Sequence, residues 1–287
     1  AIVVRLVGSE MCIRDSSPSF YAFSSIFYLE QSSIWAECGN SVVISSSARL
    51  HGAPSIPLSR SGSYQPWRLG SVMKVAVLSS GGKDSSAAIW WAQCQGWEVT
   101  HLVTMLVQGG DSWMFQVPGT HMVQAQAEAC DVDWLPIETF GSPEEEISDL
   151  ERGIENLDIE GIVSGALRSD YQKTRLEQMS HRLGIKSFTP LWHQSPKSHM
   201  EGLVRNGFEV MISGVSSEGL DKSWLGKVLC SNSLIELENL SQKYRFNFDG
   251  EGGEYETLIV NGPHMRYGID LNFNIYWDGV RGHLDFN

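Results

Sequence analysis

Residues 79–86 read Ser-Ser-Gly-Gly-Lys-Asp-Ser-Ser and stand between an apolar run at 75–78 and a helix-forming run at 86–92. This order predicts a buried strand, a glycine loop and a helix. Adjacent glycines let the backbone approach a ligand closely, and the start of the helix offers unpaired N–H groups and a positive dipole end. A nearby lysine and several hydroxyls suit a multiply charged anion such as pyrophosphate. We therefore predict a phosphate site made of Ser79, Ser80, Gly81, Gly82, Lys83, Asp84 and Ser85.

This loop matches neither the Walker A pattern nor the GxGxxG dinucleotide fingerprint. Its order, SGGKDS, resembles the PP-loop of the ATP pyrophosphatases, which cleave ATP between the α and β phosphates and pass AMP to an acceptor. The resemblance implies ATP as the nucleotide. The alternative is a chance glycine turn after a strand, but six residues in register at a strand-to-helix junction favour the phosphate site.

The first 72 residues differ from the rest, because 17 of them are Ser and no helical or strand period persists. We expect the native chain to start at Met73 and residues 1–72 to be a non-native or disordered extension. A targeting peptide or a small extra domain is the alternative.

The composition disfavours several partners. The chain has 21 Lys and Arg against 34 Asp and Glu, and residues 73–287 hold 16 and 30 of these, a net charge of −14. Proteins that grip nucleic acid usually present a basic surface, so we expect no nucleic-acid partner. No apolar run approaches the length of a membrane span, and no CxxC pair suggests zinc, so we expect a cytoplasmic protein without a membrane contact.

The order of segments after the glycine loop predicts the fold class. Apolar runs alternate with helical segments of ordinary length, which is typical of βαβ units in a doubly wound, mostly parallel α/β sheet. We assign residues 73–213 to this nucleotide-binding domain and residues 214–287 to a smaller α+β part that binds substrate. The tail alternates like antiparallel strands with a turn at 278–279.

Two further stretches carry charge in an unusual pattern. Arg168, Lys173 and Arg175 form a basic cluster in an acidic protein; a solvated helix face is the alternative, but we expect Arg175 to reach a phosphate or carboxylate. Residues 249–257 place four acids around three glycines. They could form a solvated turn, hold Mg²⁺ or orient an amine nucleophile.

Taken together, several motifs resemble the diphthine ammonia ligase family, and the match runs from Met73 to near the end. They are SGGKDS, the Ser-x-Tyr-Gln-x-x-Arg pattern at 169–175, Pro-Leu-Trp at 190–192, and the segments 219–226 and 250–257. The resemblance implies ATP-dependent amidation of diphthine on translation elongation factor 2. We expect free ammonium as the simpler nitrogen donor and Mg²⁺ as cofactor. Eukaryotic members carry extra C-terminal domains, so this chain resembles the short archaeal form.

This chemistry suggests roles for individual residues. Lys83 and a Mg²⁺ ion at Asp84 would offset charge on the departing pyrophosphate. We expect Glu251, Glu254 and Glu256 to lie near the acyl-adenylate and to orient or deprotonate the ammonium.

Diphthine carries a trimethylammonium group without N–H donors, so we expect aromatic faces to recognise it. The candidate substrate-binding residues are Trp113, Tyr171, Gln172, Trp192 and Trp224, with Phe115 beside the first of them. Core packing is the alternative for each ring.

Two rival functions remain open. One is a PP-loop enzyme that thiolates or aminoacylates tRNA, which the acidic charge and the lack of CxxC disfavour. The other is a nucleotide-binding module without catalysis, which would have no need of Lys83, Asp84 and the acidic cluster.

Overall fold

The computed structural model describes residues 72–107, 122–140 and 143–286, so the expectations about residues 1–71, Trp113 and Phe115 lie outside the described part. Within these ranges, no helix has the length and apolar character needed to cross a bilayer. The elements, in chain order, are β1 (Lys74–Leu78), α1 (Lys83–Cys94), β2 (Glu98–Val107), α2 (Val123–Cys130), β3 (Asp133–Thr139), α3 (Pro143–Ile154), β4 (Gly161–Val163), α4 (Asp170–Leu183), β5 (Lys186–Phe188), α5 (Pro196–Arg205), β6 (Glu209–Val215), η2 (Lys222–Trp224), α6 (Ser231–Tyr244), β7 (Tyr255–Asn261), β8 (Phe273–Trp277) and β9 (Gly282–Phe286).

The first five strands form one parallel sheet in the order β3-β2-β1-β4-β5. The predicted α/β, doubly wound class is confirmed. From β1 the chain adds β2 and β3 outward on one side of the sheet, and then β4 and β5 outward on the other side. The strand order therefore reverses between β1 and β4. Ligands in such sheets bind beyond the carboxyl ends of the strands at this point.

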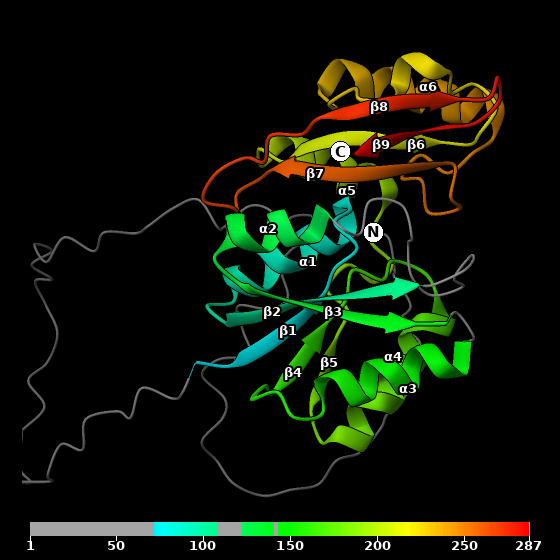
Figure 1. Ribbon diagram of the computed structural model, residues 1–287. Helices are drawn as coiled ribbons and strands as arrows, with labels where there is room; N and C mark the ends of the chain where they lie inside the picture. The colour runs from blue at the N-terminus through cyan, green and yellow to red at the C-terminus, as the bar shows by residue number, and fades with distance from the viewer. Residues whose placement is uncertain (1–71, 108–121, 141–142, 287) are drawn as a thin grey trace, which may run out of the picture. The chain divides into compact units, whose positions relative to one another are not determined.

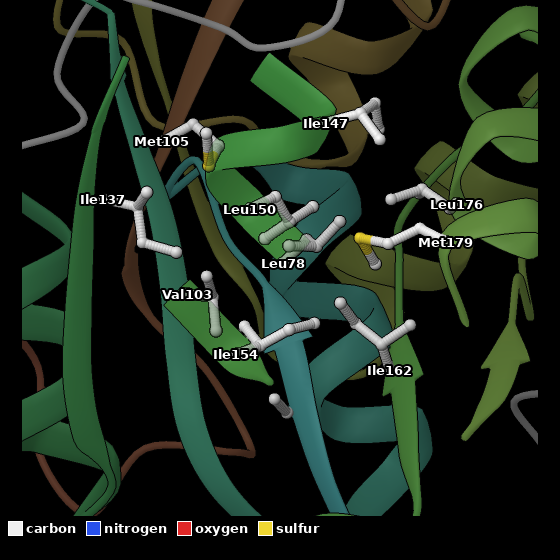
Figure 2. Close-up of a cluster of buried hydrophobic side chains, with 11 residues drawn as sticks. Leu78, Val103, Met105, Ile137, Ile147, Leu150, Ile154, Ile162, Leu176 and Met179 are labelled. Carbon is white, nitrogen blue, oxygen red and sulfur yellow. The ribbon is translucent and has the colours of Figure 1, made fainter. Parts of the chain in front are cut away.

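Helices cover both faces of this sheet, with α1 and α2 on one face and α3 and α4 on the other (Figure 1). The alternation of side chains along β1 explains the two layers. Val75 and Val77 pack against α1 and α2, whereas Ala76 and Leu78 face α3 and α4. Figure 2 shows the second of these clusters, in which Leu150 and Met179 are completely buried.

The last four strands form a separate antiparallel sheet in the order β7-β6-β9-β8. The predicted antiparallel tail is confirmed: β8 and β9 form a hairpin, and Asp278 Oδ1 accepts the N–H groups of Val280 and Arg281 at its turn. One expectation was wrong. Residues up to 213 were assigned to the domain with the parallel sheet, but β6, which covers the last of them, lies in the antiparallel sheet. The division into domains at residue 213 stays a prediction, and the sheets change earlier, between β5 and β6.

A buried histidine in the second part predicts acid sensitivity. His264 stacks on Phe208 with ring centroids 5.3 Å apart, and neither ring nitrogen has a hydrogen-bond partner among the described residues. Burial lowers the pKa of His264 from 6.5 to about 3. Between these values the unfolded chain binds a proton that the folded chain does not, so this contribution to stability is complete above pH 6.5 and is lost as the pH falls.

We therefore expect His264→Phe to flatten the acid side of the stability profile. At pH 5, His264 should lower the free energy of unfolding of the wild type by about 2 kcal/mol relative to neutral pH. Urea unfolding of both proteins at pH 7 and pH 5 measures the difference, and the exposed His283→Phe serves as control. An identical loss of stability in wild type and His264→Phe would show that this ring is not the acid-sensitive group.

Candidate active site

The glycine loop joins β1 to α1 as the sequence predicts, and Gly81 is the residue that needs to be glycine. Its φ is +82°, and an added Cβ would lie 3.1 to 3.3 Å from Gln126, Leu258 and Val123. Gly82 is the N-cap of α1 with φ −80°, a conformation open to other residues. The backbone freedom that we ascribed to both glycines therefore belongs to the first.

Two donors fix the peptide between these glycines. The Gly81 carbonyl accepts a hydrogen bond from Ile259 N at 3.0 Å and from Gln126 Nε2 at 2.9 Å. In a trans peptide the following N–H points the opposite way. The Gly82 N–H is thus directed away from β7 and α2, and Gly82 lines the adjoining cavity.

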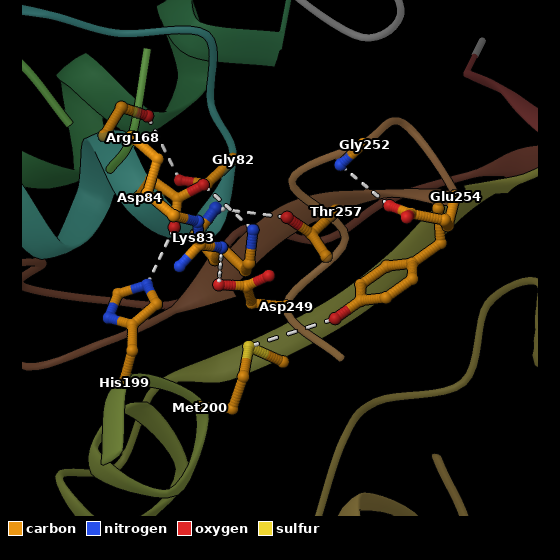
Figure 3. Close-up of polar contacts among 12 residues, drawn as sticks. Gly82, Lys83, Asp84, Arg168, His199, Met200, Asp249, Gly252, Glu254 and Thr257 are labelled. Carbon is orange, nitrogen blue, oxygen red and sulfur yellow. Dashed lines mark hydrogen bonds and ion pairs between the residues drawn. The ribbon is translucent and has the colours of Figure 1, made fainter. Parts of the chain in front are cut away.

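The buried Lys83 and the partly exposed Asp84 form an ion pair in the first turn of α1 (Figure 3). Lys83 Nζ lies 2.9 Å from Asp84 Oδ2, and the Lys83 N–H donates to Thr257 Oγ1 at 3.1 Å. Burial alone would lower the pKa of Lys83, but Asp84, Asp249 and Glu251 together raise it. Burial alone would raise the pKa of Asp84, but Lys83 and a hydrogen bond from His199 lower it to about 2. Both groups are therefore charged at neutral pH.

A cavity of about 450 Å³ opens beside this pair, at the point where the strand order reverses. Its volume is in the range usual for small-molecule sites. An apolar wall from Leu78, Val103, Met105 and Leu176 faces the polar loop. The predicted residues that it brings together are Ser79, Ser80, Gly82, Lys83, Asp84, Ser85, Gln172, Glu251 and Glu256.

The segment that follows β4 packs directly on the first turn of α1. A Cβ on Gly165 would lie 2.6 Å from the backbone carbon of Asp84, closer than real contacts allow. The adjacent Ser164 lines the cavity, and its buried Oγ has no hydrogen-bond partner in the described part of the chain. Gly165 thus lets two neighbouring strand ends form one continuous cavity wall.

The glutamates of the segment 249–257 have two different roles. Glu251 and Glu256 line the cavity. Partial loss of solvent together with the nearby Asp84 charge raises the pKa of Glu251, although this residue remains exposed on one side. Glu254 differs from our expectation, because it is not among the cavity-lining residues. Its carboxylate accepts hydrogen bonds from the backbone N–H groups of Asn247 and Gly252, both at 2.8 Å. Glu254 therefore closes the loop that carries Glu251.

An ion pair anchors the start of the same segment. The Asp249 side chain is completely buried and pairs with the Arg168 guanidinium. Its second oxygen, Oδ1, has no hydrogen-bond partner among the residues that the structure describes. Because Arg168 follows β4 and Asp249 precedes β7, this pair ties the two sheets together at the cavity.

The aromatic residues that we expected to bind the substrate contact cationic side chains of the protein itself. The Trp224 ring is buried with Lys227 Nζ 3.9 Å from its centroid, and Lys173 Nζ lies 5.4 Å from the Trp192 centroid. Arg175 Cζ lies 3.5 Å from the centroid of the Tyr171 ring and Arg175 does not line the cavity, so its expected contact with a phosphate stays a prediction. One of the protein's own cations thus lies over each of these three rings, and their recognition of the substrate stays a prediction.

Comparison with known proteins decides the family. A family model described as "Diphthamide synthase N-terminal domain" matches residues 73–187, and one described as "Diphthamide synthase C-terminal domain" matches residues 195–287. A Bos taurus protein named "Diphthine--ammonia ligase" is 33% identical over 217 residues, which are 68% of this chain and 81% of the relative. The chain belongs to the diphthamide synthase family.

Relatives with the same printed name are covered to different extents. The Homo sapiens protein of the same name is 31% identical over 217 residues, again 68% of this chain and 81% of the relative. The Schizosaccharomyces pombe protein is 32% identical over 219 residues, or 69% of this chain but only 36% of the relative. The chain thus spans about a third of the length of this last diphthamide synthase relative.

Four residues that help to build this diphthamide synthase site were missed from the sequence as site residues. They are Gln126, Arg168, His199 and Thr257. Arg168 was noticed only as part of a basic cluster, and Thr257 as the end of the acidic segment. Gln126 and His199 carried no local signal, because their partners are distant in the sequence. Among the described residues, no group of three His, Cys, Asp or Glu side chains has the arrangement of a protein-only metal site.

Proposed function

We propose that this protein is an ATP-dependent ligase that converts the diphthine carboxylate on translation elongation factor 2 to diphthamide, using ammonium. The names of its relatives support the reaction. The observation that carries the proposal is one cavity lined both by the anion-binding loop and by Glu251 and Glu256. A nucleotide-binding module without catalysis would not need these carboxylates in the wall of the same cavity.

In the first step, a diphthine carboxylate oxygen attacks the α-phosphorus of ATP. The bond from that phosphorus to the bridging oxygen breaks, and pyrophosphate leaves with the electron pair. Lys83 Nζ, the Gly82 N–H and the hydroxyls of Ser79 and Ser85 would bind the pyrophosphate oxygens, whose negative charge grows in the transition state. The apolar wall would pack against the adenine ring.

The residues present fit a Mg²⁺ ion that is bound mainly through ATP. Magnesium in nucleotide sites takes one or two carboxylates together with phosphates and water. Asp84 is ionised and lines the cavity, and it is the side chain that would hold the ion. When bound, Mg²⁺ would neutralise charge on the phosphates.

In the second step, the nitrogen of ammonia attacks the acyl carbon, and AMP leaves with the original carboxylate oxygen. Ammonium must first lose a proton to gain a free electron pair. Glu251 is suited to accept it, because it lines the cavity and its raised pKa makes it a stronger base than an ordinary glutamate. Glu256 lines the same wall and would help to hold the cation.

We expect Glu251→Gln to slow amide formation roughly a hundredfold, while ATP affinity changes by less than about twofold. Amide formation in wild type should also fall as the pH drops through the raised pKa of Glu251, because only the ionised carboxylate accepts a proton. Mass spectrometry of the product and ATP titrations measure the two effects. Glu98→Gln, an exposed carboxylate at the start of β2, is the matched control. Unchanged amidation in Glu251→Gln would remove this residue from the chemistry.

Release of AMP and pyrophosphate tests the proposed function. We expect release when elongation factor 2 bearing diphthine is present, and none when tRNA or unmodified elongation factor replaces it. AMP release with tRNA would favour the RNA-modifying alternative. No release with any acceptor, despite ATP binding, would favour a non-catalytic module. Because this protein substrate acts in translation, we place the reaction in the cytoplasm.

A further inference from the structure

His199 contacts the loop from the other half of the chain. It lies on α5, inside the segment matched by the C-terminal family model, and its side chain is completely buried. Its Nε2 is 2.7 Å from Asp84 Oδ1 (Figure 3). The other carboxylate oxygen, Oδ2, is 2.9 Å from Lys83 Nζ. Both carboxylate oxygens of Asp84 are therefore held, one by Lys83 on α1 and the other by His199 on α5.

This geometry limits how Asp84 and Lys83 interact. An ammonium group is a compact point charge, so Lys83 alone would leave the Asp84 carboxylate free to turn while one of its oxygens stayed in contact with Nζ. Because His199 occupies Oδ1, Lys83 contacts Oδ2 alone and keeps donors for a ligand. The histidine also fixes which edge of the carboxylate faces the cavity.

We propose that His199 is a positioning residue whose Nε2–H holds the Asp84 carboxylate in the orientation needed to bind Mg²⁺·ATP. This inference rests on the proposed function, which supplies the ligand. His199 does not line the cavity and would touch neither the nucleotide nor the acceptor. Its proposed effect on nucleotide binding passes through Asp84.

Three substitutions separate positioning from packing. His199→Gln can place an amide N–H close to the position of Nε2, His199→Asn carries the same group on a shorter side chain, and His199→Leu keeps volume without a donor. We expect the Asn and Leu variants to weaken Mg²⁺·ATP binding about tenfold at low Mg²⁺ and less at high Mg²⁺. The Gln variant should stay within about threefold of wild type. ATP titrations at several Mg²⁺ concentrations measure this without turnover.

A double-mutant cycle tests whether the effect passes through Asp84. In the Asp84→Asn background, His199→Leu should change Mg²⁺·ATP affinity by less than about twofold, because the carboxylate is already gone. Full additivity of the two losses would overturn the proposal, as would equal losses in the Gln, Asn and Leu variants or no loss in any. If His199→Leu does not fold, the Gln and Asn variants decide. Failure of the proposed function would appear separately, as wild type that binds Mg²⁺·ATP but forms no amide.

Discussion

Lys83→Met should lower the rate of AMP formation by a hundred- to a thousandfold, about the loss seen when one preorganised donor to a developing negative charge is removed. The substitution takes away the positive charge beside the departing pyrophosphate. It also leaves Asp84, whose pKa of about 2 keeps it ionised, with one partner fewer and its charge facing the phosphates. Single-turnover measurements of AMP release with the protein substrate quantify the rate.

A lysine at the start of β1, the strand that leads into the glycine loop, provides the control. Lys74 begins β1 and pairs with the exposed Asp158 at 2.6 Å, away from the cavity. Lys74→Met should leave turnover unchanged, because a surface ion pair contributes little. If Lys83→Met kept more than about a tenth of the wild-type rate, the anion-binding role of the loop would be wrong.

Arg168→Met should destabilise the protein by about 3 kcal/mol, because it leaves the buried Asp249 carboxylate without its partner. We take the lower end of the range for broken buried pairs, since the Arg168 side chain is 33% exposed. Asp249 Oδ1 has no other hydrogen bond among the described residues to soften the loss. Urea unfolding at neutral pH measures the change.

A second substitution distinguishes charge from packing. Adding Asp249→Leu to Arg168→Met removes the uncompensated carboxylate, so most of the lost stability should return. The double variant should still have poor activity, because the pair positions the segment that carries Glu251. If the double variant is no more stable than Arg168→Met, the guanidinium stabilises the fold through packing alone.

Local patterns were sufficient to predict the parallel sheet and the loop. The apolar runs that became β1 and β2 are bounded by turns and helices, and residues 79–85 fall at the strand end where ligands bind. By contrast, β6 is buried along nearly its whole length, so its sequence looks like a strand of a parallel sheet. Periodicity describes burial and does not say which sheet a strand joins.

Site residues were predicted when they stood in a motif and missed when long-range packing created them. Glu251 and Glu254 look alike in the sequence, yet one faces the cavity and the other accepts loop N–H groups. Arg168 and Asp249 are 81 residues apart, and Asp84 and His199 are 115 apart. No helical or strand period links such partners, because they come together only when segments distant in the sequence pack against each other in the fold.

Transfer of isotope-labelled nitrogen tests the proposed reaction most directly. Elongation factor bearing diphthine is incubated with the protein, ATP, Mg²⁺ and labelled ammonium, and the modified histidine is analysed by mass spectrometry while AMP is counted. We predict one labelled amide for each AMP formed, and neither product with Lys83→Met at the same time point. AMP formation without label in the histidine, or a labelled amide formed with ADP in place of AMP, would contradict the proposed ligase reaction.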